Sequence, residues 1–289
     1  MKYILAVSGG IDSVVLLDMV ANDREFRELH FDGASWPEDF IVAHFDHGIR
    51  SESNEDLAFV RQLCHRYEVT FVAGSAKLGA DSSESTARER RYEFLCSVTK
   101  DGSVVTAHHQ DDLLETIVIN LLRGTGWRGL APMNSRIKRP LLDMTKADIT
   151  SYAIDHDLDW SEDVTNFSSH YFRNRIRDRL VTMTPDNRHK LIELYYRQRQ
   201  LRKVIESDIE QLFHSVATSE SHNIIIPRYW LIMASETVAL ELLHRATERR
   251  LTRPQLGRVL WFAKAAKNGK QLLFHAVNIQ ATRRSLIIT

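Results

Sequence analysis

The sequence predicts an α/β fold, a doubly wound and mainly parallel sheet, followed by a smaller and mainly helical second domain. Short apolar runs rich in β-branched residues alternate with amphipathic stretches from residue 3 to residue 123, as in parallel strands connected by helices. A long helical pattern begins at Pro185, and shorter helical patterns follow it. A chain of 289 residues is long enough for about two domains. Since the long helical pattern begins at Pro185, we place the domains at 1–182 and 183–289.

The expected elements follow from the spacing of apolar residues. In the first domain the strands are 3–7, 40–46, 69–73 and 103–107, and the helices begin near residue 13 and span 52–67, 85–100 and 111–123, where Gly124 ends the last one. The segment from Thr145 to Asp148 resembles the start of a further helix, which ends at 155–159. In the second domain we expect helices at 185–216, 235–250 and 253–267 and a short strand-like tail at 272–279 and 285–288. The apolar helix faces of the second domain fit either a core or a homodimer interface.

The segment SGGIDS, residues 8–13, connects the first strand to its helix. Its glycines let the backbone approach an anion, and the first N–H groups of a helix lack partners, so this turn suits a phosphate. The lysine of the usual phosphate-binding loop is absent and Asp12 stands inside the segment, which suggests Mg²⁺ or a pyrophosphate held through metal. The alternative is a plain strand-turn-helix in which Ser13 is an N-cap.

A second polar segment, HHQDDLLET, follows the fourth strand. Asp111 and Glu115 lie four residues apart and share a helical face, with Asp112 beside them. Carboxylates next to a phosphate site suit metal binding and proton transfer in nucleotide activation. The alternative is a group of acids that stabilises a helix N-terminus through the helix dipole. His108 and His109 fit either ligands or hydrogen-bonded scaffolding.

Two groups of arginines are candidates for binding phosphates or RNA. Arg88 and Arg91 of RERRYEF share a helical face, where guanidinium groups either clamp a phosphate or are solvated. The segment RNRIR, which begins at Arg173, follows aromatic residues at the domain junction. Arginine interleaved with aromatic side chains suits RNA, whose splayed bases stack on rings, although a plain basic helix start has the same composition.

The charges of the chain are divided unevenly although their total is zero. Residues 1–170 carry 17 Lys+Arg and 28 Asp+Glu, whereas residues 171–289 carry 21 and 10. The basic second part predicts a polyanion as partner, and electrostatic docking of two domains is the alternative. Cys64 and Cys96 form no C-x-x-C pair, which argues against a zinc finger or an iron–sulfur cluster and favours a reducing cytoplasm. No apolar run approaches the roughly 18 residues of a membrane span.

Together these motifs resemble the tRNA(Ile)-lysidine synthetase family, within the N-type ATP pyrophosphatases of the PP-loop superfamily. SGGIDS is similar to the SGGxDS pyrophosphate loop, ARERRYEF to an R-x-x-RY helix, and HHQDDLLET with LLRGTGWRGLAPM to an H-x-x-DD-x-x-ET block and glycine-rich loop. HFDHGIRSESNED, RPLLDM and DVTNFSSHYFRNRIR match further elements in the same order. The resemblance covers about residues 1–180 and implies PP-loop topology for the sheet.

The resemblance implies a reaction in which ATP, with Mg²⁺, adenylates the wobble cytidine of an isoleucine tRNA with a CAU anticodon, and L-lysine then displaces AMP. It implies that Asp46, Asp112 and Glu115 bind metal and the lysine ammonium, and that one of them takes a proton, since only a neutral amine attacks. The resemblance implies that ATP is bound by Ser8, Gly9, Gly10, Ile11, Asp12, Ser13, Arg88, Arg91 and His108, and Mg²⁺ by Asp12 and Asp112. It implies that the catalytic residues are Asp46, Asp112, Glu115 and Arg173, and that the tRNA is bound by Arg173, Asn174, Arg175 and Arg177.

Departures from the family and other functions are part of the expectation. Leu113 stands where the family commonly has a glutamine. The sequence looks like the catalytic domain and the helical second domain without the extra C-terminal domain of longer members, so we expect the grip on the tRNA to come from the basic second part or to be weaker. A cluster-dependent tRNA thiolation enzyme would need cysteine pairs, and an amidotransferase resembling GMP or asparagine synthetase would leave the basic part unexplained. A noncatalytic RNA-binding protein would have no use for Asp12, Asp46, Asp112 and Glu115 together.

Overall fold

The computed structural model describes residues 2–46, 53–76, 84–133, 137–161, 172–220, 223–274 and 277–289, without the side chains of residues 53, 54, 84, 85, 172 and 174. The chain forms two compact units, Met1–Gln198 and Arg199–Thr289. They divide inside helix α8 (Pro185–Val216), later than the 182/183 boundary expected from the sequence. The first part of α8 belongs to the first unit because Tyr195 is buried against Leu113 and Ile117 of helix α5 (Gln110–Leu122).

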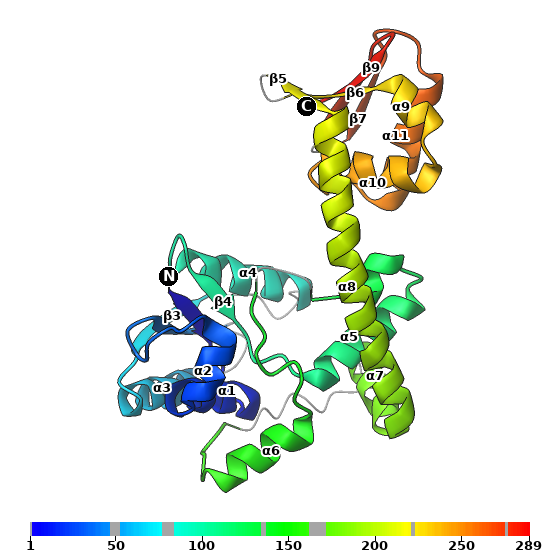
Figure 1. Cartoon of the computed structure of the whole chain (residues 1–289). Coiled ribbons are helices and arrows are strands. Elements are labelled where there is room, and N and C mark those ends of the chain that lie inside the picture. Colours follow the sequence, from blue (N-terminus) through cyan, green and yellow to red (C-terminus); the bar gives the residue numbers. More distant parts are fainter. Residues whose placement is uncertain are drawn as a thin grey trace. The chain divides into compact units, whose positions relative to one another are not determined.

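The first unit contains a four-stranded sheet in the order β3-β2-β1-β4, and all its neighbouring strands are parallel (Figure 1). The strands are β1 (Tyr3–Ala6), β2 (Phe40–Asp46), β3 (Thr70–Ser75) and β4 (Ser103–Val105). From β1 the chain builds the sheet outward to β3 and then returns to place β4 on the other side of β1. The segments after β1 and β4 therefore meet at a topological switch point, the usual ligand position in such a sheet.

Helices cover both faces of this sheet, which confirms the doubly wound fold. On one face of the sheet, Leu5 of β1 lies in a core with α1 (Ile11–Asn22), α3 (Ser53–Arg66) and α6 (Lys146–Asp155). On the other face, the preceding residue Ile4 packs against Leu95 of α4 (Glu84–Ser97). This alternation follows from the two-residue period of a strand. The remaining helical elements are α2 (Arg24–Phe31), a 3₁₀ turn at Trp127–Leu130 and α7 (Phe172–Val181).

The second unit combines three helices and the end of α8 with a five-stranded antiparallel sheet in the order β5-β6-β9-β8-β7. Its elements are β5 (Thr218–Glu220), β6 (Asn223–Pro227), α9 (Arg228–Met233), α10 (Glu236–Ala246), α11 (Arg253–Ala265), β7 (Gln271–Phe274), β8 (Val277–Ala281) and β9 (Ser285–Ile288). The sheet is larger than the tail expected from the sequence. β5 and β6 were not expected because they are short, and the single run 272–279 corresponds to two strands.

Two local predictions, the helix end at Gly124 and the helix start at Thr145, are confirmed by the backbone. Gly124, with a φ of +63°, follows α5 in the left-handed conformation that commonly ends a helix. Thr145 and Asp148 form the capping box at the start of α6. Over the described residues, no helix combines the length and the apolar character that crossing a bilayer requires.

Candidate functional site

Loop 8–13 is held by hydrogen bonds among its own residues. Ser13 lies in the first turn of α1, where its hydroxyl accepts hydrogen bonds from the amides of Ser8 and Gly9, each 3.2 Å long, and donates to the carbonyl of Gly10 at 2.8 Å. Gly10 occupies the N-cap position, so Ser13 does not serve as the N-cap. Gly9 has a φ of +100°, which an L-residue rarely adopts. The loop is therefore closed over itself at the N-terminal end of α1, where the first helical amides lack intrahelical partners.

Two neighbouring segments fix the base of loop 8–13. The buried imidazole of His44, on β2, has its Nδ1 atom 2.9 Å from the carbonyl oxygen of Val7. The amide of Ser161 donates to the carbonyl of Gly9 at 2.9 Å, and the hydroxyl of Ser161 bonds to Asp56 of α3 at 2.5 Å. His44 thus supports the base of the loop from the interior of the protein.

The buried side chain of His109 lies between loop 8–13 and the start of α5. Its Nε2 atom is 3.8 Å from a carboxylate oxygen of Asp12 and 3.6 Å from one of Asp112, and its Nδ1 atom is 3.8 Å from Asp111. His109 is also the N-cap of α5, in a reciprocal capping box with Asp112. The two segments that the sequence singled out thus meet, and His109 links them as scaffolding.

Glu115 is the most deeply buried carboxylate of the site, with 1% of its side chain exposed. Its two oxygens accept hydrogen bonds from the Nε atoms of Arg173, at 2.7 Å, and of Arg177, at 2.6 Å. The guanidinium groups of both arginines also face Asp112, at 3.7 and 4.0 Å. α7 is therefore fastened to α5 by two arginines from the segment expected to bind RNA.

His108 and the arginines of α4 form the basic side of the site. Burial, together with the positive charges of Arg139, Arg88, Arg91 and Arg173, lowers the pKa of His108 to about 3. His108 is therefore neutral at physiological pH, and its Nδ1 atom lies 2.7 Å from the hydroxyl of Thr106. Sequence reasoning missed Arg139, although its place at the start of RPLLDM was a signal that could have found it.

The two expected arginines of α4 converge on one ring. The guanidinium carbons of Arg88 and Arg91 lie 5.0 and 5.3 Å from the ring centroid of Tyr92. Arg90, between them in sequence, instead pairs with Glu93 on an exposed part of the helix. Arg88 and Arg90 are exposed, whereas Arg91 is half-buried.

Two further basic residues of the site were missed because their partners lie far along the chain. The ammonium of Lys146 is 2.5 Å from a carboxylate oxygen of Asp12, and the guanidinium of Arg188 is 2.5 Å from one of Asp111. Burial raises the pKa of Asp111, but hydrogen bonds from the Lys146 amide and from Arg188 outweigh it, so the pKa lies below its ordinary value. No local pattern marks either residue.

The remaining predicted residues are placed as follows. Asp46 ends β2, and its carbonyl accepts a hydrogen bond from the amide of Ala76. Arg175 is exposed on α7, and the side chain of Asn174 lies outside the description, as do residues 47–52 and 162–171. Leu113, the departure from the family pattern, is fully buried in the core between α5 and α8, so it lies away from the polar side chains of the site.

The magnesium ligands expected from the sequence are Asp12 and Asp112. No group of three or more His, Cys, Asp or Glu side chains is arranged to hold a metal ion by itself within the described residues. A magnesium ion that arrives with a nucleotide needs only one or two carboxylates besides phosphate oxygens and water. Asp12 and Asp112 both lie against the Nε2 atom of His109. This pair of neighbouring carboxylates, one inside loop 8–13 and one on α5, fits that need.

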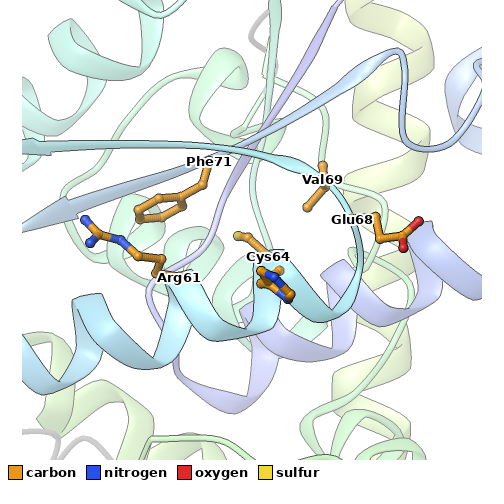
Figure 2. Close-up of a pocket in the computed structure, with 6 residues that line it drawn as sticks. Arg61, Cys64, Glu68, Val69 and Phe71 are labelled. Atoms are coloured by element: carbon orange, nitrogen blue, oxygen red, sulfur yellow. The ribbon is translucent and has the colours of Figure 1, made fainter.

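A shallow pocket of about 420 Å³ lies elsewhere, on α3 and β3, and Figure 2 shows Arg61 beside Phe71 at one end of it. It contains none of the candidate residues. Burial raises the pKa of the Cys64 thiol in this pocket to about 12, so the thiol stays protonated and unreactive. The pocket lining is Arg61, Cys64, His65, Glu68, Val69 and Phe71. We assign it no part in the chemistry.

Comparison with known proteins gives a consistent family match. A family model described as a PP-loop domain matches residues 1–184. The tRNA(Ile)-lysidine synthase of Wigglesworthia glossinidia brevipalpis is 35% identical over 199 residues, which cover 63% of this chain and 48% of that protein. The enzyme of the same name from Porphyromonas gingivalis W83 is 35% identical over 235 residues, covering 76% and 48%. The chain spans about half the length of these curated relatives.

A solved structure with the same fold is the U34-tRNA thiolase NcsA from Methanococcus maripaludis, determined with its [4Fe-4S] cluster. The TM-score is 0.54 at 15% identity, and the match covers 70% of this chain and 72% of the thiolase. At this identity the likeness concerns the fold alone. It agrees with the parallel sheet of the first unit.

Proposed function

Because the chain belongs to the PP-loop domain family, we propose that it is an ATP-dependent ligase that forms lysidine in tRNA. In this reaction the C2 oxygen of the wobble cytidine attacks the α-phosphate of ATP and pyrophosphate leaves. The side-chain amine of L-lysine then attacks C2, a carbon–nitrogen bond forms, and AMP leaves with the oxygen. The substrate is the isoleucine tRNA with a CAU anticodon, and curated relatives named tRNA(Ile)-lysidine synthase support this choice.

One observation carries the proposal, the double ion pair of Glu115 with Arg173 and Arg177. It fastens the arginines expected to bind tRNA next to Asp112, which in turn shares His109 with Asp12 of loop 8–13. A nucleotide at the loop and a tRNA base near the arginines would then be neighbours. An enzyme that joins ATP to a tRNA base requires this proximity.

Loop 8–13 is the proposed binding site of the departing pyrophosphate. The open amides at the start of α1 and the positive end of the helix dipole suit a polyanion. Asp12 and Asp112 would hold Mg²⁺, which neutralises phosphate charge when it is bound. Arg88 and Arg91, with neutral His108 beside them, would bind the rest of the nucleotide, and their positive charges favour a phosphate.

Lysine is the proposed second substrate, and the carboxylates of Asp46 and Asp112 are proposed to bind its ammonium group. An ammonium group has to lose a proton before it attacks, and a carboxylate within hydrogen-bond reach can accept that proton. Glu115 holds two arginines, so we assign it to the orientation of Arg173 and Arg177 toward the tRNA. Asp46 is nearby in topology because β2 is next to β1 in the sheet.

The second unit is the proposed binding surface for the body of the tRNA. The proposed location of the protein is the cytoplasm. Residues 199–289 carry 14 Lys+Arg and 7 Asp+Glu, so this unit is basic. A basic surface attracts a nucleic acid through its phosphates without reading sequence. Specificity for the isoleucine tRNA would then come from the contacts at the anticodon.

Labelled lysine tests the proposal. The protein is incubated with ATP, Mg²⁺, radiolabelled lysine and a transcript of the isoleucine tRNA, and the label in acid-precipitable RNA is counted. We expect incorporation that requires ATP and stops when the wobble cytidine is changed to uridine. Incorporation without ATP, or none at all with the cytidine transcript, would refute the proposal. ATP-dependent release of pyrophosphate also separates it from a noncatalytic RNA-binding protein.

A further inference from the structure

Loop 8–13 contains no lysine of its own, and the ammonium group of Lys146, on α6, lies against it. No lysine lies in residues 8–13, yet the ammonium of Lys146 is 2.5 Å from Asp12 inside that loop. We propose that Lys146 binds the pyrophosphate portion of the nucleotide at loop 8–13, and that Asp111 and Arg188 are positioning residues for it. This inference rests on the part of the proposed function that places nucleotide phosphates at the loop.

The backbone of Lys146 is fixed by neighbouring elements. Lys146 is the first residue of α6, and its amide donates a hydrogen bond of 2.9 Å to Asp111. The segment before it is tied to α5 by the amide of Gln110, which donates to the carbonyl of Met144 at 2.9 Å. The base of the Lys146 side chain is therefore held at a defined distance from loop 8–13.

Arg188 completes the support of Asp111 from α8. Its Nη1 atom lies 2.5 Å from the carboxylate oxygen of Asp111 that does not bind the Lys146 amide. Its Nη2 atom donates to the carbonyl of Leu180, near the end of α7, at 2.9 Å. Both oxygens of Asp111 are thus engaged, and charge-assisted hydrogen bonds of this kind are the stronger ones.

The tip of Lys146 is free to exchange its partner. Its side chain is 46% exposed and that of Asp12 is 33% exposed, and a pair so open to water contributes little stability. A polyphosphate at the loop carries more negative charge than one carboxylate, so the ammonium would move from Asp12 to a phosphate oxygen at small cost. The same move would release an oxygen of Asp12 toward the magnesium ion.

Binding of inorganic pyrophosphate with Mg²⁺ to the full chain, measured by calorimetry, tests the proposal apart from catalysis. We expect Lys146→Met to weaken this binding about 10- to 100-fold, as for a lost hydrogen bond to a charged group. Lys146→Arg should recover most of the affinity because it keeps the charge. Adenosine, which has no phosphate, should bind all three proteins alike.

A second comparison separates direct contact from mere neutralisation of Asp12. Lys146→Met is measured again in an Asp12→Asn background. A direct phosphate contact predicts that the loss persists in this background, whereas a cation that only balances Asp12 predicts that it disappears. Disappearance of the loss, or pyrophosphate affinity that is unchanged in the single variant, would overturn the proposal.

The positioning role has its own readout. We expect Arg188→Ala to weaken pyrophosphate binding about 3- to 10-fold, Arg188→Lys to restore part of it, and the effect of Arg188→Ala to vanish in the Lys146→Met background. Arg197→Ala, which removes an exposed ion pair with Glu193 on the same helix, is the matched control. An Arg188 effect of equal size without Lys146 would contradict the positioning role.

The outcomes also separate this inference from the proposed function. A protein that binds pyrophosphate through Lys146 but incorporates no lysine into tRNA would uphold the inference and refute lysidine synthesis. A wild-type protein that fails to bind magnesium pyrophosphate would overturn the inference, whatever its activity on tRNA.

Discussion

Loop 8–13 and the carboxylate–arginine cluster of Asp112, Glu115, Arg173 and Arg177 meet at one edge of the sheet but are built differently. The hydrogen bonds inside the loop join residues at most five positions apart, and only the support of its base by His44 and Ser161 comes from farther along the chain. Arg173 and Arg177, by contrast, reach Glu115 across 58 and 62 positions. The internal hydrogen bonds of the loop depend only on the turn between β1 and α1. The cluster requires α5 and α7 to pack first, so it is the part of the site that responds to tertiary structure.

The largest effect is expected from Glu115→Ala, which breaks the cluster and leaves the loop intact. It leaves two arginines without their buried partner, which should lower the free energy of unfolding by about 3 kcal/mol. Lysine transfer should fall about 1000-fold, because the arginines lose their orientation. Transfer assays and urea unfolding measure both.

Glu193→Ala is the matched control for Glu115→Ala. Its carboxylate pairs with Arg197 on an exposed face of α8, so we expect a stability change within about 0.5 kcal/mol and normal transfer. Retention of near-normal lysine transfer by Glu115→Ala would contradict the role given to the cluster.

Gly9→Ala breaks the loop and leaves the cluster intact. The φ of +100° at Gly9 is strained for any residue with a Cβ atom, which should lower the free energy of unfolding by about 1–3 kcal/mol. ATP affinity should fall about tenfold, whereas tRNA affinity should stay unchanged. Gly33→Ala, at a φ of +79° in open space, is the control that carries similar strain far from the site. Equal ATP affinities of the two variants would refute the special role of the loop.

Ser13→Ala sharpens the comparison because it removes only side-chain hydrogen bonds from the loop. The buried hydroxyl accepts from two amides and donates to one carbonyl, so its loss should cost about 1–2 kcal/mol of unfolding free energy. We expect ATP affinity to fall about threefold, less than for Gly9→Ala. Equilibrium unfolding measures the change in stability, and nucleotide titration measures the change in ATP affinity. An unchanged stability would show that the loop does not depend on Ser13.

The smallest effect on the reaction is expected at the basic side of the site, where a change of pH alters the stability of the fold. His108 has a pKa of about 3 in the folded chain against an ordinary value of 6.5, so the unfolded chain binds more protons between these values. Its contribution to stability is therefore complete above about pH 6.5 and is lost as the pH falls toward 3. Burial also lowers the pKa of His30, so His30 likewise makes the free energy of unfolding rise with pH.

His108→Gln checks this assignment. Unfolding measured from pH 7 to pH 4 should show a slope smaller by up to about one proton than that of the wild type. His30→Gln gives the comparison for a histidine outside the site. An identical pH profile for His108→Gln and the wild type would show that His108 is not held neutral.

The comparison also explains how much the sequence could predict. Features made by neighbouring residues were predictable, among them the strand-to-helix turn at loop 8–13, the capping box of Thr145 and the helix that begins at Pro185. Each depends on residues within a few positions, and local chemistry is visible in the sequence. The doubly wound sheet followed from the regular alternation of such elements.

Long-range partners were not predictable. Lys146 reaches Asp12 across 134 positions and Arg188 reaches Asp111 across 77, and neither residue has a local pattern that announces a partner. The ion pairs of Glu115 were not predictable for the same reason, since a buried carboxylate on α5 looks like a free acid until α7 is in place. Only the packing of helices decides which charges meet.

The central claim is that the loop and the cluster serve one reaction in two steps, and ATP labelled in its α-phosphate tests it most directly. The protein is mixed with this ATP, Mg²⁺ and the isoleucine tRNA in the absence of lysine. The claim predicts label on the tRNA that depends on the wobble cytidine and is released as AMP when lysine is added. No label on the tRNA, or label that persists after lysine is added, would contradict it.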